Sequence, residues 1–251
     1  MLEVKNLTVS FGGLKAVNDM NMVVQKGEIH SLIGPNGAGK TTMFNAITRV
    51  IRNNTGDIYF KGESLNKVKS FKIIYKGITR TFQNLQLFKT LNVYQNILSG
   101  FIHNYNGGVS NIFSDSKKNF EREARIKILE VAEILDIKNR LLSYPSQLSY
   151  GILKRVEIAR AIVSNPEIVL FDEPAAGLNH NETSEIRDIL KMLNDNGKTI
   201  FLVEHDMNLV MKVSKRITVM SFGKKIAEGT PKEIANNEKV ITEYLGETKN
   251  A

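Results

Sequence analysis

A glycine-rich loop with a lysine at its end is the segment of this chain most clearly suited to chemistry. Residues 34–42 read GPNGAGKTT and directly follow the apolar stretch 29–33. This spacing fits the phosphate-binding loop G-x-x-x-x-G-K-[ST] at every fixed position. Glycines let backbone N–H groups approach phosphate oxygens, and the helix expected next would present the positive end of its dipole to them. The sequence therefore predicts a nucleoside triphosphate site.

The same loop supplies side chains for the terminal phosphates and for a metal ion. Lys40 would place a mobile positive charge near those phosphates, and the Thr41 hydroxyl would reach Mg²⁺. The expected cofactors are therefore ATP and Mg²⁺. The predicted nucleotide-binding residues of the loop are Gly34, Pro35, Asn36, Gly37, Ala38, Gly39, Lys40, Thr41 and Thr42.

Two adjacent carboxylates follow a continuous apolar run at 168–171. Asp172 is placed to hold Mg²⁺ directly or through water, and Glu173 to orient and polarise the attacking water as a general base. His205 comes after the next apolar run, 200–203, where its imidazole would contact the γ-phosphate. We therefore name Glu173, His205 and Lys40 as catalytic candidates. An exposed strand end and a structural histidine are the competing interpretations, and His30, His103 and His180 keep the structural one.

Apolar periodicity predicts the elements that position these groups. The continuous runs 168–171 and 200–203 indicate central strands of a parallel sheet covered on both faces, with active residues at the carboxyl ends. Alternating apolar and polar residues predict an antiparallel layer from the amino-terminal part of the chain. These alternating segments are 2–4, 7–9, 17–24 and 58–60.

Helical spacing predicts helices over 121–137 and 152–163, whereas 101–118, rich in Asn, Ser and Gly, is expected to be an irregular loop. Residues 217–220 and 226–227 are expected to form a hairpin. The predicted fold class is α/β, with a P-loop NTPase core, a mixed sheet, an antiparallel layer and an inserted helical subdomain. We expect a single domain over 1–251, divided into a nucleotide-binding core at 1–83 and 165–230, a helical subdomain at 84–164 and a helical tail at 231–251.

Composition narrows the class of protein. The 251 residues include no cysteine, which excludes disulfides, cysteine-ligated zinc and iron–sulfur clusters. No apolar run approaches the roughly 18 residues of a membrane span, and residues 1–6 lack the order of a secretory signal. We therefore expect a soluble cytoplasmic chain that needs a partner for any membrane role. The net charge of +8 is spread along the sequence, as on a solvated mixed surface.

The segment 148–151, Leu-Ser-Tyr-Gly, opens the helix expected over 152–163. Ser149 suits its N-cap, and capping alone would explain that residue. Taken in order, however, the phosphate loop, residues 80–83, this segment, residues 172–173 and His205 resemble the ATP-binding cassette (ABC) ATPases. The resemblance covers essentially the whole chain.

Within that superfamily the chain resembles the ATPase subunits of branched-chain amino acid importers. The segments that carry this likeness are 11–18, 79–87, 172–179, 204–207 and 227–231. The resemblance implies that Phe11 and Val17 pack on the adenine ring and that Gln83 senses Mg²⁺ and relays to membrane subunits. It also implies that Ser149 and Gly151 complete the ATP site of a second protomer in a head-to-tail dimer.

Partners follow from the same resemblance. They would be integral membrane permease subunits, a second cassette (with a mixed pair favoured over two copies), and indirectly an extracytoplasmic solute-binding protein. The chain would then lie peripherally at the cytoplasmic face of the membrane, with no nucleic acid bound. One departure is Ile152, where cassettes usually carry Gln or Glu, and we expect it to weaken dimer closure. An exporter or lipid-extracting machine and a nucleic-acid-associated cassette are the competing hypotheses, and the transported solute stays open.

Overall fold

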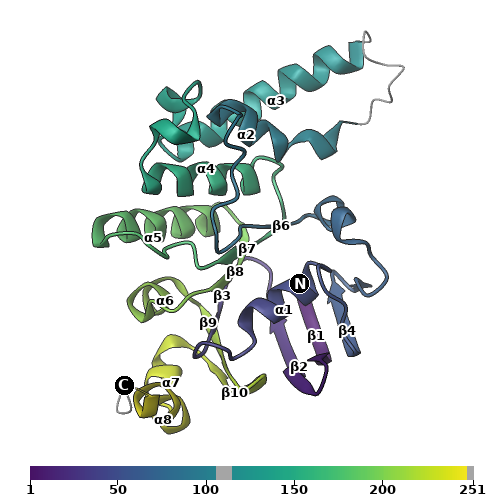
Figure 1. Ribbon diagram of the computed structural model, residues 1–251, viewed down its shortest axis with the longest axis vertical. Coiled ribbons are helices and arrows are strands. Elements are labelled where there is room, and N and C mark those ends of the chain that lie inside the picture. Colours follow the sequence, from purple (N-terminus) through teal and green to yellow (C-terminus); the bar gives the residue numbers. More distant parts are fainter. Residues whose placement is uncertain (106–114, 248–251) are drawn as a thin grey trace.

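Two β-sheets and a stack of helices make up the protein in the computed structural model, which describes residues 1–105 and 115–247 (Figure 1). The strands are β1 (Leu2–Phe11), β2 (Leu14–Val24), β3 (Ile29–Ile33), β4 (Thr55–Phe60), β5 (Glu63–Ser64), β6 (Ile78–Arg80), β7 (Ile168–Asp172), β8 (Thr199–Val203), β9 (Arg216–Ser221) and β10 (Lys224–Gly229). The α-helices are α1 (Lys40–Ile47), α2 (Val93–Ser99), α3 (Asp115–Ile134), α4 (Tyr150–Ile162), α5 (His180–Asp195), α6 (Met207–Val213), α7 (Pro231–Ala235) and α8 (Glu238–Glu247).

The central sheet has the strand order β10-β9-β3-β8-β7-β6. Its strands run parallel except for β10, which pairs antiparallel with β9 as the predicted hairpin. Every residue of β7 and β8 is buried, which confirms the two apolar runs as central parallel strands. Asp172 pairs with Val203 in the register of these strands, so the carboxyl ends of β7 and β8 lie side by side.

The second sheet is antiparallel, with the order β2-β1-β4-β5, which confirms the antiparallel layer. The two alternating segments at 2–4 and 7–9 form one strand, and its register shifts between Val4 and Leu7. Helix α1 contributes to the core beneath this sheet, where the rings of Phe44 and Phe201 lie 4.9 Å apart. This core fixes α1, and with it the preceding loop, against the central sheet.

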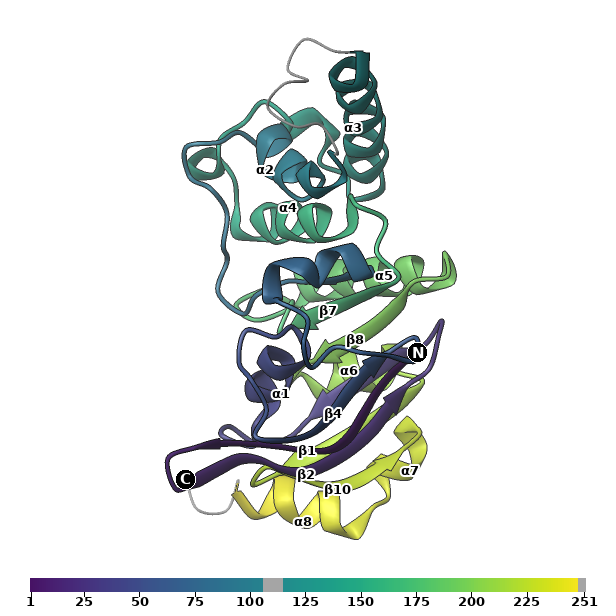
Figure 2. The same cartoon turned by 90° about the vertical axis from the view of Figure 1, so that its right-hand side faces the viewer.

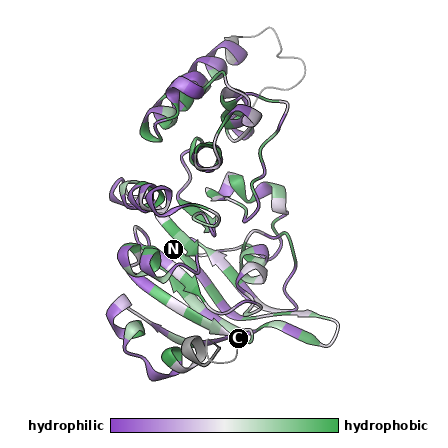
Figure 3. Cartoon of the chain, turned by 60° about the vertical axis from the view of Figure 1, so that its left-hand side comes forward, coloured by the Kyte–Doolittle hydropathy of each residue, from purple (hydrophilic) through white to green (hydrophobic). Residues whose placement is uncertain are grey.

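Helices α2, α3, α4 and α5 are stacked on the opposite side of the central sheet (Figures 1 and 2). A smaller core joins α6, α7 and α8 to β9. The strands of the central sheet carry much hydrophobic colour, whereas the helices carry both hydrophobic and hydrophilic colour, as expected for helices with one buried side (Figure 3). Within the described residues, no helix is both long and apolar enough to cross a membrane.

The segment after α2 differs from its predicted structure. Residues 102–104 form a 3₁₀ turn and α3 begins at Asp115, so the loop expected over 101–118 is wrong at both ends; 106–114 lie outside the described residues. Buried Phe101 stacks on Phe120 at 5.6 Å, and this packing outweighs the polar composition. The helix predicted to reach residue 137 ends at Ile134, because Asp136 adopts a left-handed conformation with φ of 53°.

Candidate functional site

The loop 34–42, predicted to bind phosphate, connects β3 to α1 and is enclosed by neighbouring backbone. A side-chain carbon on Gly39 would lie 2.2 Å from the carbonyl oxygen of Ala16, and one on Gly34 would lie 2.2 Å from that of Met220. Gly39 also has φ of 102°, a conformation that favours glycine. The turn of this loop therefore depends on glycine at these two positions, for reasons of space as well as conformation.

Lys40 lies at the start of α1 with its ammonium group turned back into the loop. Its Nζ donates hydrogen bonds to the carbonyl oxygens of Gly34 at 2.7 Å and Pro35 at 2.9 Å. Burial lowers the pKa of Lys40, while the charges of Glu173 and Asp172 act in the opposite direction. Next to it, Thr41 is exposed on the first turn of the helix. The loop thus combines a buried cation with an accessible hydroxyl.

Asp172 ends β7 and is buried, with 1% of its surface exposed. One carboxylate oxygen accepts a hydrogen bond from Arg80 Nη2 at 2.5 Å, and the other, Oδ1, is buried with no hydrogen-bond partner in the described part of the chain. Burial raises the pKa of Asp172, and the Arg80 guanidinium opposes that shift. An unpaired buried carboxylate oxygen is suited to accept from a water bound to Mg²⁺. The donor set therefore fits the predicted metal ion.

Glu173 follows in a left-handed conformation, with φ of 49°. Such a conformation costs a non-glycine residue about 1–2 kcal/mol, so the surroundings must hold it. Its backbone N–H donates to the Val203 carbonyl at 2.9 Å. Its carboxylate accepts a hydrogen bond from Gln83 Nε2 at 3.0 Å and lies 3.7 Å from His205 Nδ1. The structure thus brings three of the predicted site residues together, two of them at the ends of neighbouring strands.

Glu204 is a residue of this site that the sequence reasoning did not single out. It is fully buried, and its carboxylate accepts hydrogen bonds from the backbone N–H groups of Ala175 at 2.8 Å and His205 at 3.1 Å. Burial raises the pKa of Glu204. The carboxylate thereby ties the turn after β7 to the turn after β8. The available signal was an acidic residue directly after the apolar run 200–203.

The two residues expected to pack on adenine lie in different environments. Phe11 is 53% exposed at the end of β1 and available to a ligand. Val17 is completely buried opposite Val9, in the core beneath the antiparallel sheet, so its expected contact with the base stays a prediction. Because strand residues alternate between faces, the partly exposed Ala16 lies beside the loop instead, its carbonyl oxygen close to Gly39.

Ser149 and Gly151 lie at the start of α4, on the helical stack. Ser149 occupies the N-cap position and is exposed, but its side chain makes no capping hydrogen bond, so capping does not account for its hydroxyl. Gly151 is buried, and a side-chain carbon there would lie 2.6 Å from Glu182 Oε1. Ile152 is partly buried against the helical core. Ser149 therefore offers a hydroxyl at a helix N-terminus.

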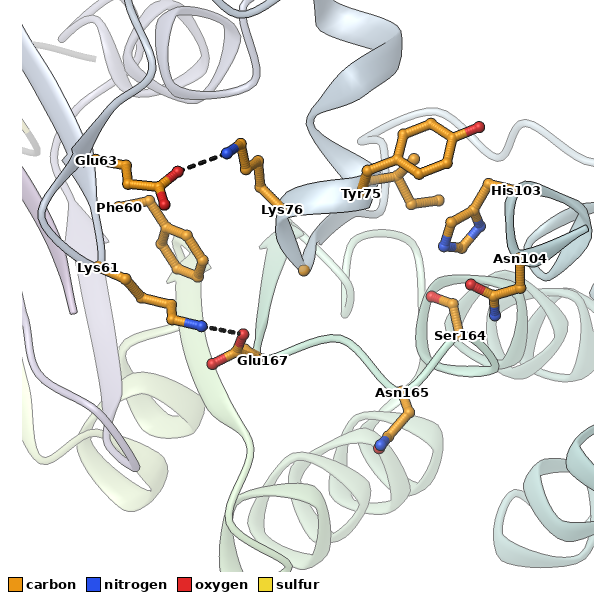
Figure 4. Close-up of a pocket in the computed structure, with 12 residues that line it drawn as sticks. Phe60, Lys61, Glu63, Tyr75, Lys76, His103, Asn104, Ser164, Asn165 and Glu167 are labelled. Atoms are coloured by element: carbon orange, nitrogen blue, oxygen red, sulfur yellow. Dashed lines mark hydrogen bonds and ion pairs between the residues drawn. The ribbon is translucent and has the colours of Figure 1, made fainter. Parts of the chain in front are cut away.

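A polar pocket of about 390 Å³ lies elsewhere, and Figure 4 shows its lining. Two ion pairs cross it, Lys76 with Glu63 at 2.5 Å and Lys61 with Glu167 at 2.7 Å. None of the predicted site residues lines it, and its charges are balanced internally. We assign it no chemistry.

The remaining histidines were expected to be structural. His30 is fully buried, and its ring nitrogens lie 2.8 Å from the Thr218 hydroxyl and 3.3 Å from a Glu28 oxygen, which confirms that expectation. The ring of His103 makes an edge contact with Tyr75, and His180 begins α5.

The chain is similar to known proteins along most of its length. A family model described as ABC transporter matches residues 17–176, and one described as branched-chain amino acid ATP-binding cassette transporter matches 224–249. The chain is 40% identical to the high-affinity branched-chain amino acid transport ATP-binding proteins BraF of Pseudomonas aeruginosa and LivG of Escherichia coli, over 98% of each chain. It is 34% identical to the lipopolysaccharide export system ATP-binding protein LptB of Haemophilus influenzae, also over 98% of each chain.

Solved structures show the same likeness. The ADP conformation of an ATP-binding cassette of an ABC transporter superposes with a TM-score of 0.85 at 30% identity, covering 98% of each chain. A dimeric bacterial ABC transporter cassette superposes with a TM-score of 0.78 at 29% identity, covering 92% of this chain and 99% of that one.

Proposed function

Since this chain belongs to the ABC transporter family of ATP-binding cassettes, we propose that it is the ATP-hydrolysing subunit of an importer for branched-chain amino acids. The observation that supports ATP hydrolysis is the position of Glu173, directly after β7, the strand that pairs with β6. Its carboxylate accepts a hydrogen bond from Gln83 and lies beside His205. Branched-chain amino acids are favoured as the solute because the relatives BraF and LivG, named for their transport, are 40% identical to this chain. The export protein LptB is 34% identical.

In this proposal the loop 34–42 holds the phosphates of ATP. Lys40 exchanges its bonds to the Gly34 and Pro35 carbonyls for phosphate oxygens, and Phe11 supports the base. Glu173 accepts a proton from water as the water oxygen attacks the γ-phosphorus, and the bond from that phosphorus to the bridging oxygen of ADP breaks. His205 positions the γ-phosphate. Phosphoryl transfer depends mainly on such positioning and charge stabilisation.

Mg²⁺ would be held by the Thr41 hydroxyl and by Asp172 directly or through water, with Gln83 close by. When bound, it would neutralise phosphate charge. The unpaired Oδ1 of Asp172, which has no partner among the described residues, supports this assignment.

A second cassette completes the proposed site. Ser149 and Gly151 lie at the start of α4 in the helical stack, whereas the loop 34–42 lies between β3 and α1. We therefore assign Ser149 and Gly151 to the ATP that is bound by a partner protomer. The dimeric cassette that superposes on this chain supports the assembly, and we favour a mixed pair with a related cassette. We treat 1–83 and 165–230 as the nucleotide-binding core, 84–164 as the helical subdomain and 231–251 as the tail.

The remaining partners would be two permease subunits in the membrane and an extracytoplasmic binding protein that recognises the solute. The chain would then work peripherally at the cytoplasmic face. A second candidate function is export or lipid extraction, and the 34% identity to LptB supports it.

Affinity purification of the tagged chain from gently solubilised native membranes, in the presence of ATP, tests the assembly. Recovery of two multispanning subunits, a second cassette and a solute-binding protein is the expected result. Recovery of export-type membrane proteins would replace the importer with the second candidate. Recovery of nucleic acid, or of soluble partners alone, would overturn the transport function and leave the ATP site intact.

A further inference from the structure

A basic cleft of about 830 Å³ lies outside the proposed ATP site, between the chain that follows α1 and the chain that follows β5. Four cations line it, and no described residue of the lining is Asp or Glu. These four are Arg49, Arg52, Lys67 and Lys69. We propose that this basic cleft binds a phosphate-bearing ligand, either the headgroup of an anionic lipid or a free phosphate compound.

Arg49 anchors the cleft and is held by neutral acceptors. Its Nη1 donates to Asn53 Oδ1 and its Nη2 to the Asn66 carbonyl, both at 2.8 Å, while its buried Nε has no acceptor in the described residues. Burial lowers the pKa of Arg49, and the charge of Arg52 lowers it further. Asp57 accepts a hydrogen bond from Asn66 but does not line the cleft. The positive charge is therefore fixed in place without a carboxylate to neutralise it.

The polar pocket of Figure 4 differs from the basic cleft in the pairing of its charges. There, each lysine is paired with a carboxylate across the cavity, so the pocket needs no outside charge. In the basic cleft, none of the four cations forms an ion pair with any described residue. Like charges gathered in one cleft repel one another, and a bound phosphate would remove that repulsion while accepting several charge-assisted hydrogen bonds.

Phe71 adds an apolar element at the same cleft. Its ring is 64% exposed, and Lys69 Nζ lies 6.0 Å from the ring centroid. Segments that lie on anionic membranes combine Lys and Arg with apolar side chains such as Phe, which enter the headgroup boundary. This favours a lipid headgroup as one source of the phosphate. The proposal does not depend on the transported solute or on ATP hydrolysis.

Binding to vesicles tests the lipid source. The full chain, saturated with ADP so that its nucleotide site is occupied, is sedimented with phosphatidylcholine vesicles with or without phosphatidylglycerol. The cleft variant Arg52→Ala/Lys67→Ala is compared with the control Lys232→Ala/Lys239→Ala, which also removes two positive charges but on α7 and α8. We expect binding only to the anionic vesicles, weakened about tenfold or more in the cleft variant and little in the control.

Calorimetric titration of the same ADP-saturated proteins with inorganic phosphate and pyrophosphate tests whether the cleft binds a free phosphate compound. If the unsubstituted chain binds phosphate or pyrophosphate but not vesicles, and the cleft variant loses that binding, the site is supported and its ligand is a soluble phosphate compound. The proposal is overturned if neither probe binds the unsubstituted chain, or if the control loses as much binding as the cleft variant. Equal ADP affinity in all proteins verifies that the variants fold.

Discussion

The side-chain amide of Gln83 donates a hydrogen bond to the carboxylate of Glu173 over 3.0 Å. Gln83 lies in the segment that runs from β6 towards α2, so this bond connects the proposed base to the chain that enters the helical stack. A displacement of that segment would move or release the Glu173 carboxylate. The bond therefore provides a physical route by which the helices, and any partner on them, can affect water activation.

Replacing the proposed base should separate hydrolysis from binding. Glu173→Gln keeps the shape of the side chain and removes the proton acceptor, so we expect ATP turnover to fall by about 10²–10⁴-fold while ATP still binds. Phosphate release and nucleotide affinity measure the two effects. Glu167→Gln, which alters a carboxylate on the polar pocket, serves as the control. Comparable turnover in Glu173→Gln and the unsubstituted chain would overturn the assigned role.

Removing the loop lysine should weaken nucleotide binding itself. Lys40→Ala deletes a charge-assisted donor, so we expect ATP affinity to fall by about 10–100-fold. Titration with a fluorescent ATP analogue measures it. Lys26→Ala, at an exposed position outside the loop, should bind as the unsubstituted chain does. Equal affinities in the two variants would contradict the placement of Lys40 against the phosphates.

The buried pair of Arg80 and Asp172 should be sensitive to loss of one partner. Arg80→Ala leaves the Asp172 carboxylate buried without its cation, and such a change costs about 3–5 kcal/mol in the free energy of unfolding. Urea denaturation without nucleotide measures it. The double variant Arg80→Met/Asp172→Leu should recover part of the loss, because it removes the unpaired charge. A double variant less stable than Arg80→Ala would contradict this account.

Glu204 should give the unfolding free energy a characteristic pH dependence. Burial raises its native pKa above the ordinary value of 4.5, so between these two pKa values the native state binds more protons at this site than the unfolded chain. The contribution of Glu204 to stability therefore falls as pH rises through that window. In Glu204→Gln the contribution is absent, while other titrating groups are shared. Urea titrations of the unsubstituted chain and of Glu204→Gln measure the free energy of unfolding across pH. We expect the difference between the two to shift in favour of the variant as pH rises. A difference that stays constant would contradict a raised pKa of Glu204.

Ile152 should limit closure of the proposed dimer. Ile152→Gln introduces a polar side chain beside Ser149 and Gly151, so we expect a larger ATP-dependent dimer population. Size-exclusion chromatography with ATP measures it, in the Glu173→Gln background where ATP should persist. Leu142→Gln, at a residue that is 82% exposed, controls for a general gain in polarity. No change in the dimer population would show that position 152 is not limiting.

The local sequence pattern was enough to predict a feature wherever its structural or chemical requirement falls on consecutive residues. The loop 34–42 was recognisable because a tight turn requires glycine at fixed positions. The strands β7 and β8 were recognisable because burial on both faces requires continuous apolar runs. The start of α3 was missed because packing of Phe101 on Phe120 joins residues separated by a stretch of polar composition.

The sequence by itself determined the phosphate loop, the parallel strands and the identity of the carboxylates that follow them, because each depends on neighbours along the chain. Only the tertiary structure decided that Val17 faces the core while Ala16 lies beside the loop, and that Glu204 ties two turns together. It also decided that four cations from two separate segments share one cleft whose described lining holds no carboxylate. Such relations depend on which face a residue takes and on what another segment places opposite it, and neither is encoded by local spacing.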